Sequence, residues 1–140
     1  MEKKLKFEIP GKIKGKQRPR FGGGVVYTSK DTLNYENWIK HCFLQKKANP
    51  NLTKDVPVKI YINCYFDIPK SYTKKKTLGC LDGSVRPTKK PDPDNILKIV
   101  CDALNKIAYD DDKQIIYAQI EKFYAKTEKL VVTIEYLEGI

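Results

Sequence analysis

The sequence predicts a single α+β domain, spanning residues 1–140, with two main helices packed on one mixed β-sheet and with long basic loops. Three observations lead to this fold class. Several short segments alternate apolar with polar residues, as half-buried strands do. Two longer segments carry apolar residues at helical spacing. A chain of 140 residues is long enough for one domain with a substantial core, and no internal repeat divides it.

The N-terminal part is expected to form a strand, a basic loop and a short returning strand. Leu5, Phe7 and Ile9 alternate with charged residues, which predicts a half-buried strand. The segment GKIKGKQRPRFGGG follows and is interrupted by glycine and proline. Such runs are usually solvated loops, but here glycines allow close approach to a ligand and arginines offer forked donors to phosphate. Residues 25–27 are expected to return as a short strand.

A helix is predicted from a cap at Ser29 or Asp31 to about Lys47. Its apolar stripe consists of Tyr35, Trp38, Ile39, Cys42 and Phe43. Aromatic residues at helical spacing usually belong to the core, so Trp38 is predicted to be buried. His41 is expected on the helix surface. The turn-rich segment NPNLTKDVP that follows is too short to be a domain linker.

The second half of the chain begins with the clearest strand, residues 58–67, in which apolar residues occupy every second position. Residues 70–90 hold seven basic residues and one acid and are predicted to be a long polar loop. Because long loops in compact domains are usually functional or disordered, we expect a mobile arm that contacts phosphate. Residues 114–125 and 130–137 are predicted as two final strands joined by a tight turn.

Between these parts, a helix is predicted from Asp92 to about Lys106, with acidic residues at both ends. Asp92 is a good N-cap residue, and Pro93 suits the first helical position. One face of this helix is apolar and predicted to be buried. The opposite face presents Asp94, Lys98, Asp102 and Asn105. Three consecutive acids, Asp110, Asp111 and Asp112, follow the helix.

These acids have a structural and a functional interpretation. Acids in a first helical turn complement the helix dipole, and Lys98 is placed to pair with Asp94 one turn away. This structural interpretation leaves the second cluster unexplained, because negative charge after a helix end opposes the dipole and adjacent acids repel one another. Local rules are broken in this way mainly at functional sites. A divalent metal ion is the simplest partner for such a cluster.

The charge distribution indicates a polyanionic ligand. The chain has 27 basic and 17 acidic residues, a net charge of +10. Residues 1–90 hold 21 basic and 7 acidic side chains, whereas residues 91–140 hold 6 and 10. A basic body with an acidic pocket is expected where metal ions and phosphates meet.

Other classes of site have little support. The four cysteines include no CxxC pair, and His41 is the single histidine, so a structural zinc site lacks ligands. Reduced cysteines and the absence of a signal peptide or apolar membrane segment predict a cytoplasmic protein. Ser/His and Cys/His catalysis likewise lack a recognisable motif.

The central segment KKPDPDNILKIVCDALN, followed by YDDDKQI, resembles the RusA family of Holliday-junction resolvases, whose pattern is approximately KPDxDNxxKxxxDALN and then DDxQ. The upstream segments KGKQRPRF, VYTSKDTLNYENWI and RPTKKPD are also similar to that family. The resemblance therefore covers most of the chain. Members of the family are common on phages and prophages.

The resemblance implies a Mg²⁺-dependent endonuclease, with Mn²⁺ as a substitute, that acts as a homodimer on four-way DNA junctions in recombination and repair. Such an enzyme would work at the nucleoid of a bacterial or phage-infected cell. Carried over by position, the catalytic and metal-binding acids are Asp92, Asp94 and Asp112, and the catalytic lysine is Lys98. The extra acid Asp110 makes the choice of the third ligand depend on the register of Gln114, and Asp111 is a possible additional ligand.

Phosphate contacts are expected from the basic segments, through the side chains of Lys16, Arg18, Arg20, Lys74, Lys75, Lys76, Arg86, Lys89 and Lys90. We also expect the three carboxylates to lie close enough to share one or two metal ions. Three alternatives stay open at this point: a catalytically silent DNA-binding protein, a metal-regulated interaction protein, and a nuclease for other branched DNA.

Overall fold

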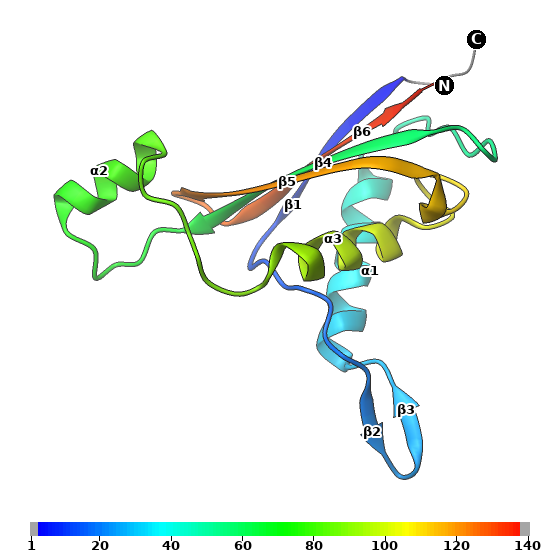
Figure 1. Cartoon of the computed structure of the whole chain (residues 1–140), viewed down its shortest axis with the longest axis horizontal. Coiled ribbons are helices and arrows are strands. Elements are labelled where there is room, and N and C mark those ends of the chain that lie inside the picture. The colour runs from blue at the N-terminus through cyan, green and yellow to red at the C-terminus, as the bar shows by residue number, and fades with distance from the viewer. Residues whose placement is uncertain (1–2, 138–140) are drawn as a thin grey trace.

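The protein is built around one four-stranded sheet, seen in a computed structural model that describes residues 3–137. Its strands are β1 (Lys4–Pro10), β4 (Val58–Asp67), β5 (Ile115–Ala125) and β6 (Lys129–Tyr136). They lie in the order β1-β6-β4-β5, with β4 and β5 parallel and the other neighbours antiparallel. The helices α1 (Lys30–Gln45) and α3 (Pro93–Leu104) cover the same face of this sheet (Figure 1). The predicted α+β class is confirmed.

The core lies between the sheet and these two helices. Along β4, every second side chain is buried, from Val58 to Phe66, and β1 and β6 follow the same alternation. From α3, the buried residues are Ile96, Ile99, Val100, Cys101, Ala103 and Leu104. Parallel strands need a crossover connection, and α3 lies within the one that joins β4 to β5. The core therefore fixes α3 and leaves its polar face exposed.

Helix α1 begins as predicted, at an N-cap formed by Ser29, whose side chain accepts a hydrogen bond from the Thr32 amide. His41 is exposed, as expected. The prediction for Trp38 was wrong, because this side chain is 40 % exposed. Its indole N–H donates to the Pro10 carbonyl at 2.7 Å, and its ring stacks on His41. Trp38 therefore covers the end of β1 from outside the core.

The segment predicted as a long loop contains a helix, α2 (Lys74–Asp82). Thr73 caps it by accepting a hydrogen bond from the Lys76 amide, and Gly83 ends it in the left-handed conformation, with a φ of 87°. Only Cys80 of this helix is buried. Because so few of its apolar residues face the core, this segment shows no helical periodicity by which α2 could be predicted.

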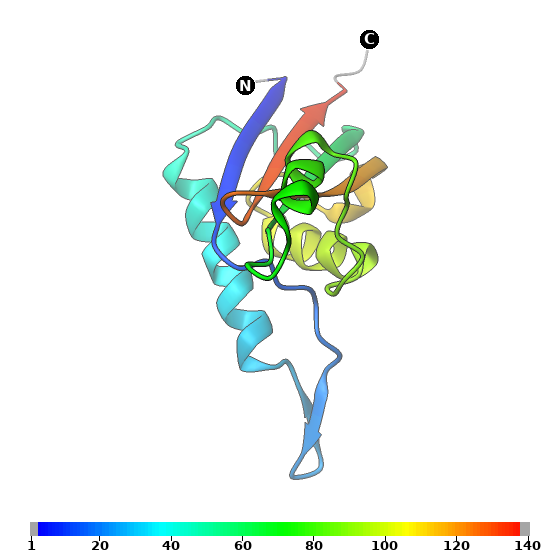
Figure 2. The same cartoon turned by 90° about the vertical axis from the view of Figure 1, so that its left-hand side faces the viewer.

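A two-stranded hairpin formed by β2 (Arg20–Gly22) and β3 (Val25–Tyr27) projects from the body beyond the start of α1 (Figure 2). The expected returning strand is thus confirmed and has a partner strand inside the predicted loop. Gly23 and Gly24 form its turn with φ values of 57° and 78°, which are accessible mainly to glycine. We call residues 20–27 the hairpin arm.

The remaining elements differ little from prediction. Helix α3 ends at Leu104 instead of Lys106, and a 3₁₀ turn, η1 (Asp112–Gln114), precedes β5. All four cysteines are free thiols. Among residues 3–137, no helix combines the length and hydrophobicity needed to cross a membrane.

Candidate active site

The first acidic pair stands at the start of α3. Asp92 occupies the N-cap position, Pro93 opens the helix and Asp94 follows in the first turn. Although an N-cap aspartate normally accepts a hydrogen bond from the first turn, the side chain of Asp92 makes no such bond. Both carboxylates are exposed, and neither forms an ion pair with any residue that the structure describes. They are therefore available to a ligand.

A basic loop, residues 11–19, is held directly against this helix start. The Lys16 amide donates to the Asn95 carbonyl at 2.8 Å. Gly15 permits this approach, since a Cβ there would lie 2.8 Å from Cβ of Pro91. Glu128 anchors the other end of the loop by accepting from the Ile13 amide at 2.7 Å. The main chain of the loop is therefore fixed beside Asp92.

An open cleft of about 830 Å³ separates the basic loop from the start of α3. Residues 12–18 and Asp31 line one side, and Lys90, Pro91, Asp92 and Asn95 line the other. The approach to Asp92 is also fixed from the sheet, because the Lys122 ammonium donates to the carbonyls of Lys89 and Pro91. A rigid, mostly basic cleft that contains a free carboxylate suits a phosphate together with a cation.

Lys16 has a different role from the one predicted. Its ammonium lies 2.7 Å from the Glu36 carboxylate of α1 and 3.2 Å from the Asp102 carboxylate of α3. Burial lowers the pKa of Lys16, but the hydrogen bonds to Glu36 and Asp102 outweigh burial, and the net shift is upward. The Lys16 side chain therefore joins the basic loop to both helices and is not free to contact phosphate.

The three acids that follow α3 differ in their partners. Asp110 pairs with Lys106 at 3.1 Å. Asp111 caps η1 by accepting from the Lys113 amide at 2.9 Å, while the Asp111 amide donates to the Gln114 side chain. The Asp112 amide is held by the Asn105 side chain at 2.9 Å. Of the three carboxylates, that of Asp112 has neither a basic partner nor a capping role among residues 3–137.

The surroundings of Asp112 are crowded with negative charge. Partial burial raises the pKa of Asp112, and the neighbouring carboxylates of Asp111 and Asp102 raise it further, whereas the positive charge of Lys98 lowers it. Lys98 forms no ion pair with Asp94 within the described part of the chain, so the structural interpretation of Lys98 as a helix-surface partner gains no support. A bound cation would relieve the repulsion around Asp112.

The expected convergence of Asp92, Asp94 and Asp112 is not observed. Among residues 3–137, no three histidine, cysteine, aspartate or glutamate side chains are gathered closely enough to hold a metal ion. Asp94 and Asp102 are eight residues apart on α3, a rise of about 12 Å, and Asp112 lies near Asp102. Lys98 lies between the two groups on the same helix.

The chemistry of these side chains nevertheless fits Mg²⁺. The ion prefers hard oxygen ligands, keeps several water molecules and usually takes one or two carboxylates. Asp92 and Asp94 at one end of α3, and Asp112 at the other, offer unpaired carboxylates of this kind. The arrangement supplies few protein ligands at each end and does not form a closed cage.

The predicted DNA-binding residues divide into two groups. Arg86 is engaged within the protein: its guanidinium pairs with Glu121 at 2.7 Å, donates to the Lys122 carbonyl and covers the Phe123 ring. In contrast, no acidic partner within residues 3–137 holds the side chains of Arg18, Arg20, Lys74, Lys75, Lys76, Lys89 or Lys90. These seven remain predicted phosphate contacts.

Sequence reasoning missed the residues that hold the acids in position. Asn105 fixes the main chain of Asp112, and the buried Gln114 side chain donates to the carbonyls of Thr53 and Val56. Asp102 anchors the basic loop through Lys16. Asn105 and Asp102 were visible as polar residues on the exposed face of α3, but their partners lie far away in the sequence.

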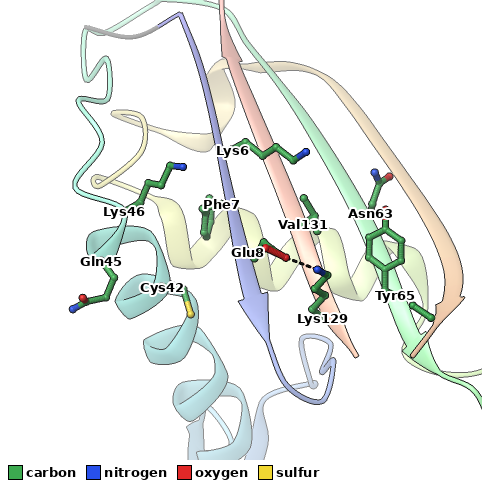
Figure 3. A pocket seen from close by; sticks show the side chains of 11 residues that line it. Lys6, Phe7, Glu8, Cys42, Gln45, Lys46, Asn63, Tyr65, Lys129 and Val131 are labelled. Carbon is green, nitrogen blue, oxygen red and sulfur yellow. Dashed lines mark hydrogen bonds and ion pairs between the residues drawn. The ribbon is translucent and has the colours of Figure 1, made fainter. Parts of the chain in front are cut away.

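A second concavity, of about 860 Å³, lies at the β1 side of the sheet, away from these acids. Figure 3 shows that Asn63, Tyr65 and Val131 project from its sheet face, beside the ion pair of Glu8 with Lys129. Its charges are mixed and already paired in part, and it contains none of the predicted catalytic residues. The cleft beside α3 is therefore the candidate site.

Comparison with known proteins identifies the family of this chain. The model of the family "Endodeoxyribonuclease RusA" matches residues 10–135. The chain is also 33 % identical over 135 residues to the uncharacterized protein YqaN of Bacillus subtilis (strain 168), an alignment that covers 93 % of this chain and 94 % of the relative. The residues matched by the family model include α3, the acids at its two ends and the basic loop. The chain belongs to the RusA endodeoxyribonuclease family.

Proposed function

We propose that this protein is a Mg²⁺-dependent endonuclease that resolves four-way DNA junctions, acting as a homodimer in recombination and repair. The observation that carries the proposal is the set of three carboxylates, Asp92, Asp94 and Asp112, left without basic partners in a chain of net charge +10. The chain has 27 basic residues, yet none forms an ion pair with these carboxylates within residues 3–137. Their availability supports a role in holding a cation.

The residues of the site would have different roles in phosphodiester hydrolysis. The basic loop and the cleft beside Asp92 would position a phosphate. Asp92 and Asp94 at one end of α3, and Asp112 at the other, would hold Mg²⁺ ions. When bound, these would supply an activated water and positive charge to offset the negative charge of the transition state. Mn²⁺, which takes similar ligands, is expected to replace Mg²⁺.

Lys98 would stabilise negative charge that develops on the phosphate. Its ammonium is exposed on α3 between the two acid groups and close enough to Asp112 to lower the pKa of that carboxyl. Nearby carboxylates favour the charged form of a lysine, so electrostatic stabilisation or positioning suits Lys98 better than proton abstraction.

The homodimer follows from the symmetry of the substrate. Paired cuts across a two-fold junction need two active sites, which a C2 dimer supplies. Light scattering on the purified protein, alone and with junction DNA, measures this directly. A single subunit on each junction would contradict the dimer without excluding nuclease activity.

The direct test of the function is cleavage of a labelled synthetic four-way junction with Mg²⁺, with Mn²⁺ and with EDTA. Linear duplex, a three-way junction and a flap serve as comparison substrates. We expect paired, metal-dependent cuts in the four-way junction. Binding without cleavage would favour the silent DNA-binding alternative, and faster cutting of flaps would assign the enzyme to other branched DNA.

The basic segments are tested by the salt dependence of binding. The side chains of Lys74, Lys75 and Lys76 stand in the first turn of α2, and that of Lys76 lies over the Tyr72 ring. If they contact phosphates, replacing all three with glutamate lowers the affinity and flattens the slope of log Kd against log salt. An unchanged slope would show that α2 does not touch DNA.

A further inference from the structure

The hairpin arm exposes an apolar surface that the fold does not use. Phe21 is 74 % exposed, Val25 62 %, Val26 61 % and Tyr27 50 %. Burial of these apolar side chains would stabilise the protein, yet the fold leaves all four exposed. Exposed apolar patches of this kind usually mark an interaction site. The arm also projects away from the body, as Figure 2 shows, which makes both its faces accessible.

The two faces of the arm differ. Antiparallel pairing places Phe21 opposite Val26, and Arg20 opposite Tyr27. Because successive residues of a strand point to opposite faces, Phe21 and Val26 share one face, and Arg20 and Tyr27 share the other. The ring of Tyr27 also covers Gly22, where a Cβ would meet it at 3.2 Å. One face of the ribbon is therefore purely apolar, and the other combines a cation with an aromatic ring.

The charge around the arm identifies its ligand as a polyanion. The chain has no acidic residue between Glu8 and Asp31, a stretch that holds six basic residues. Arg18 and Arg20 have no acidic partner among residues 3–137. A protein partner would have to bring acidic side chains to meet these arginines. DNA, in contrast, offers phosphates to the arginines and base faces to the apolar side chains.

The arm also follows directly on a segment of the candidate site. It continues from the basic loop, whose Lys16 amide bonds to Asn95 of α3 and whose Lys16 side chain bonds to Asp102. Its other strand leads directly into Ser29, the buried N-cap of α1. The segments on both sides of the arm are therefore anchored at α3 and α1.

We propose that the hairpin arm recognises the branch point of the DNA: Arg18 and Arg20 bind flanking phosphates, and the Phe21–Val26 face packs against bases left unstacked where the strands exchange. This rests on the proposed action on branched DNA and adds the element that distinguishes a branch from continuous duplex. Apolar side chains that enter base steps, and aromatic rings that stack on free bases, are known means of binding distorted DNA.

The test compares Phe21→Ala with wild type and with Leu44→Ala. Leu44 is also an exposed apolar residue, 60 % exposed, but lies on α1, outside the arm. Affinity is measured by fluorescence anisotropy for a four-way junction and for linear duplex, in Ca²⁺ to prevent cleavage. Phe21→Ala is expected to weaken junction binding about tenfold, the effect of losing one base–aromatic stack, with duplex binding unchanged. Phe21→Trp should restore junction binding, and Leu44→Ala should match wild type.

A second reading comes from 2-aminopurine placed at the branch point. Wild type should change its fluorescence on binding, and Phe21→Ala should not. Equal affinities of Phe21→Ala and wild type for the junction would overturn the inference, as would an equal loss on junction and duplex. A change in oligomeric state, followed by light scattering, would identify the apolar face as a protein interface instead. Failure of wild type to prefer the junction over duplex would instead refute the proposed function itself.

Discussion

The two ends of α3 carry the same kind of residue in different surroundings. At the N-terminal end, Asp92 and Asp94 are exposed and make no ion pair within the described chain, although the basic loop lies beside them. At the C-terminal end, Asp110 pairs with Lys106, and Asp111 caps η1. Acidic composition alone would have treated all these residues alike.

The comparison shows that the acids after α3 differ in how far the protein itself engages them. Asp110 and Asp111 shape the turn after α3, and Asn105 fixes the main chain of their neighbour Asp112. Asp112 is left with its pKa raised by burial and by nearby acids. Asp112, which the register of Gln114 indicates as the third ligand, is the one of the three acids without a basic partner or a capping role among residues 3–137.

The largest effect is expected at the N-terminal end. Asp94→Asn should lower single-turnover junction cleavage by at least a hundredfold, because a metal ligand is lost. Junction binding should be unchanged or tighter, since a negative charge near the phosphates has been removed. Cleavage at the wild-type rate would show that the exposed pair at the start of α3 is only a helix terminus.

Lys98, between the two ends, should come next. If it stabilises charge in the transition state, Lys98→Met slows cleavage on the order of a hundredfold while thermal stability and junction affinity stay the same. Lys98→Arg should also be severely impaired, because a guanidinium cannot occupy the position of an ammonium. A Met variant that cuts normally would return Lys98 to the helix surface.

A smaller effect, on stability, is expected from Asp111. Asp111→Ala removes the cap of η1 and should lower the Tm by about 3 °C in calorimetry. Asp111→Asn keeps an acceptor for the Lys113 amide and should lose less. If Asp111→Ala leaves the Tm unchanged but abolishes cleavage, Asp111 is a ligand and its capping role is secondary.

An element of the fold was predictable from sequence where its apolar residues recur at regular spacing and are buried in the structure. Helix α3 has an apolar stripe and a Pro-containing start, and β4 alternates along its whole length, so both were found from sequence. Helix α2 buries only Cys80 and was therefore taken for a loop. Trp38 lies on the apolar stripe of α1 but at the end of β1, where it stays 40 % exposed. Periodicity cannot show where the sheet ends.

The acids of the candidate site were predictable, but their environment was not. Asp92, Asp94 and Asp112 came from a motif, whereas the engagement of Lys16 by Glu36 and Asp102, and of Arg86 by Glu121, depends on chain segments that meet only in the folded protein. The same holds for Asn105 and Gln114, which hold the second acidic cluster. The spacing of the carboxylates along α3 likewise needed the structure.

The most direct test compares Asp112→Asn with Asp110→Asn, two identical changes two residues apart. The Lys106–Asp110 pair is a surface ion pair of little energetic value, so Asp110→Asn should cut a four-way junction in Mg²⁺ at close to the wild-type rate. Asp112→Asn should bind the junction with wild-type affinity and fail to cut it within the same single-turnover experiment. Equal cleavage rates for the two variants, whether both fast or both abolished, would contradict the assignment of Asp112 as the catalytic acid at this end of α3.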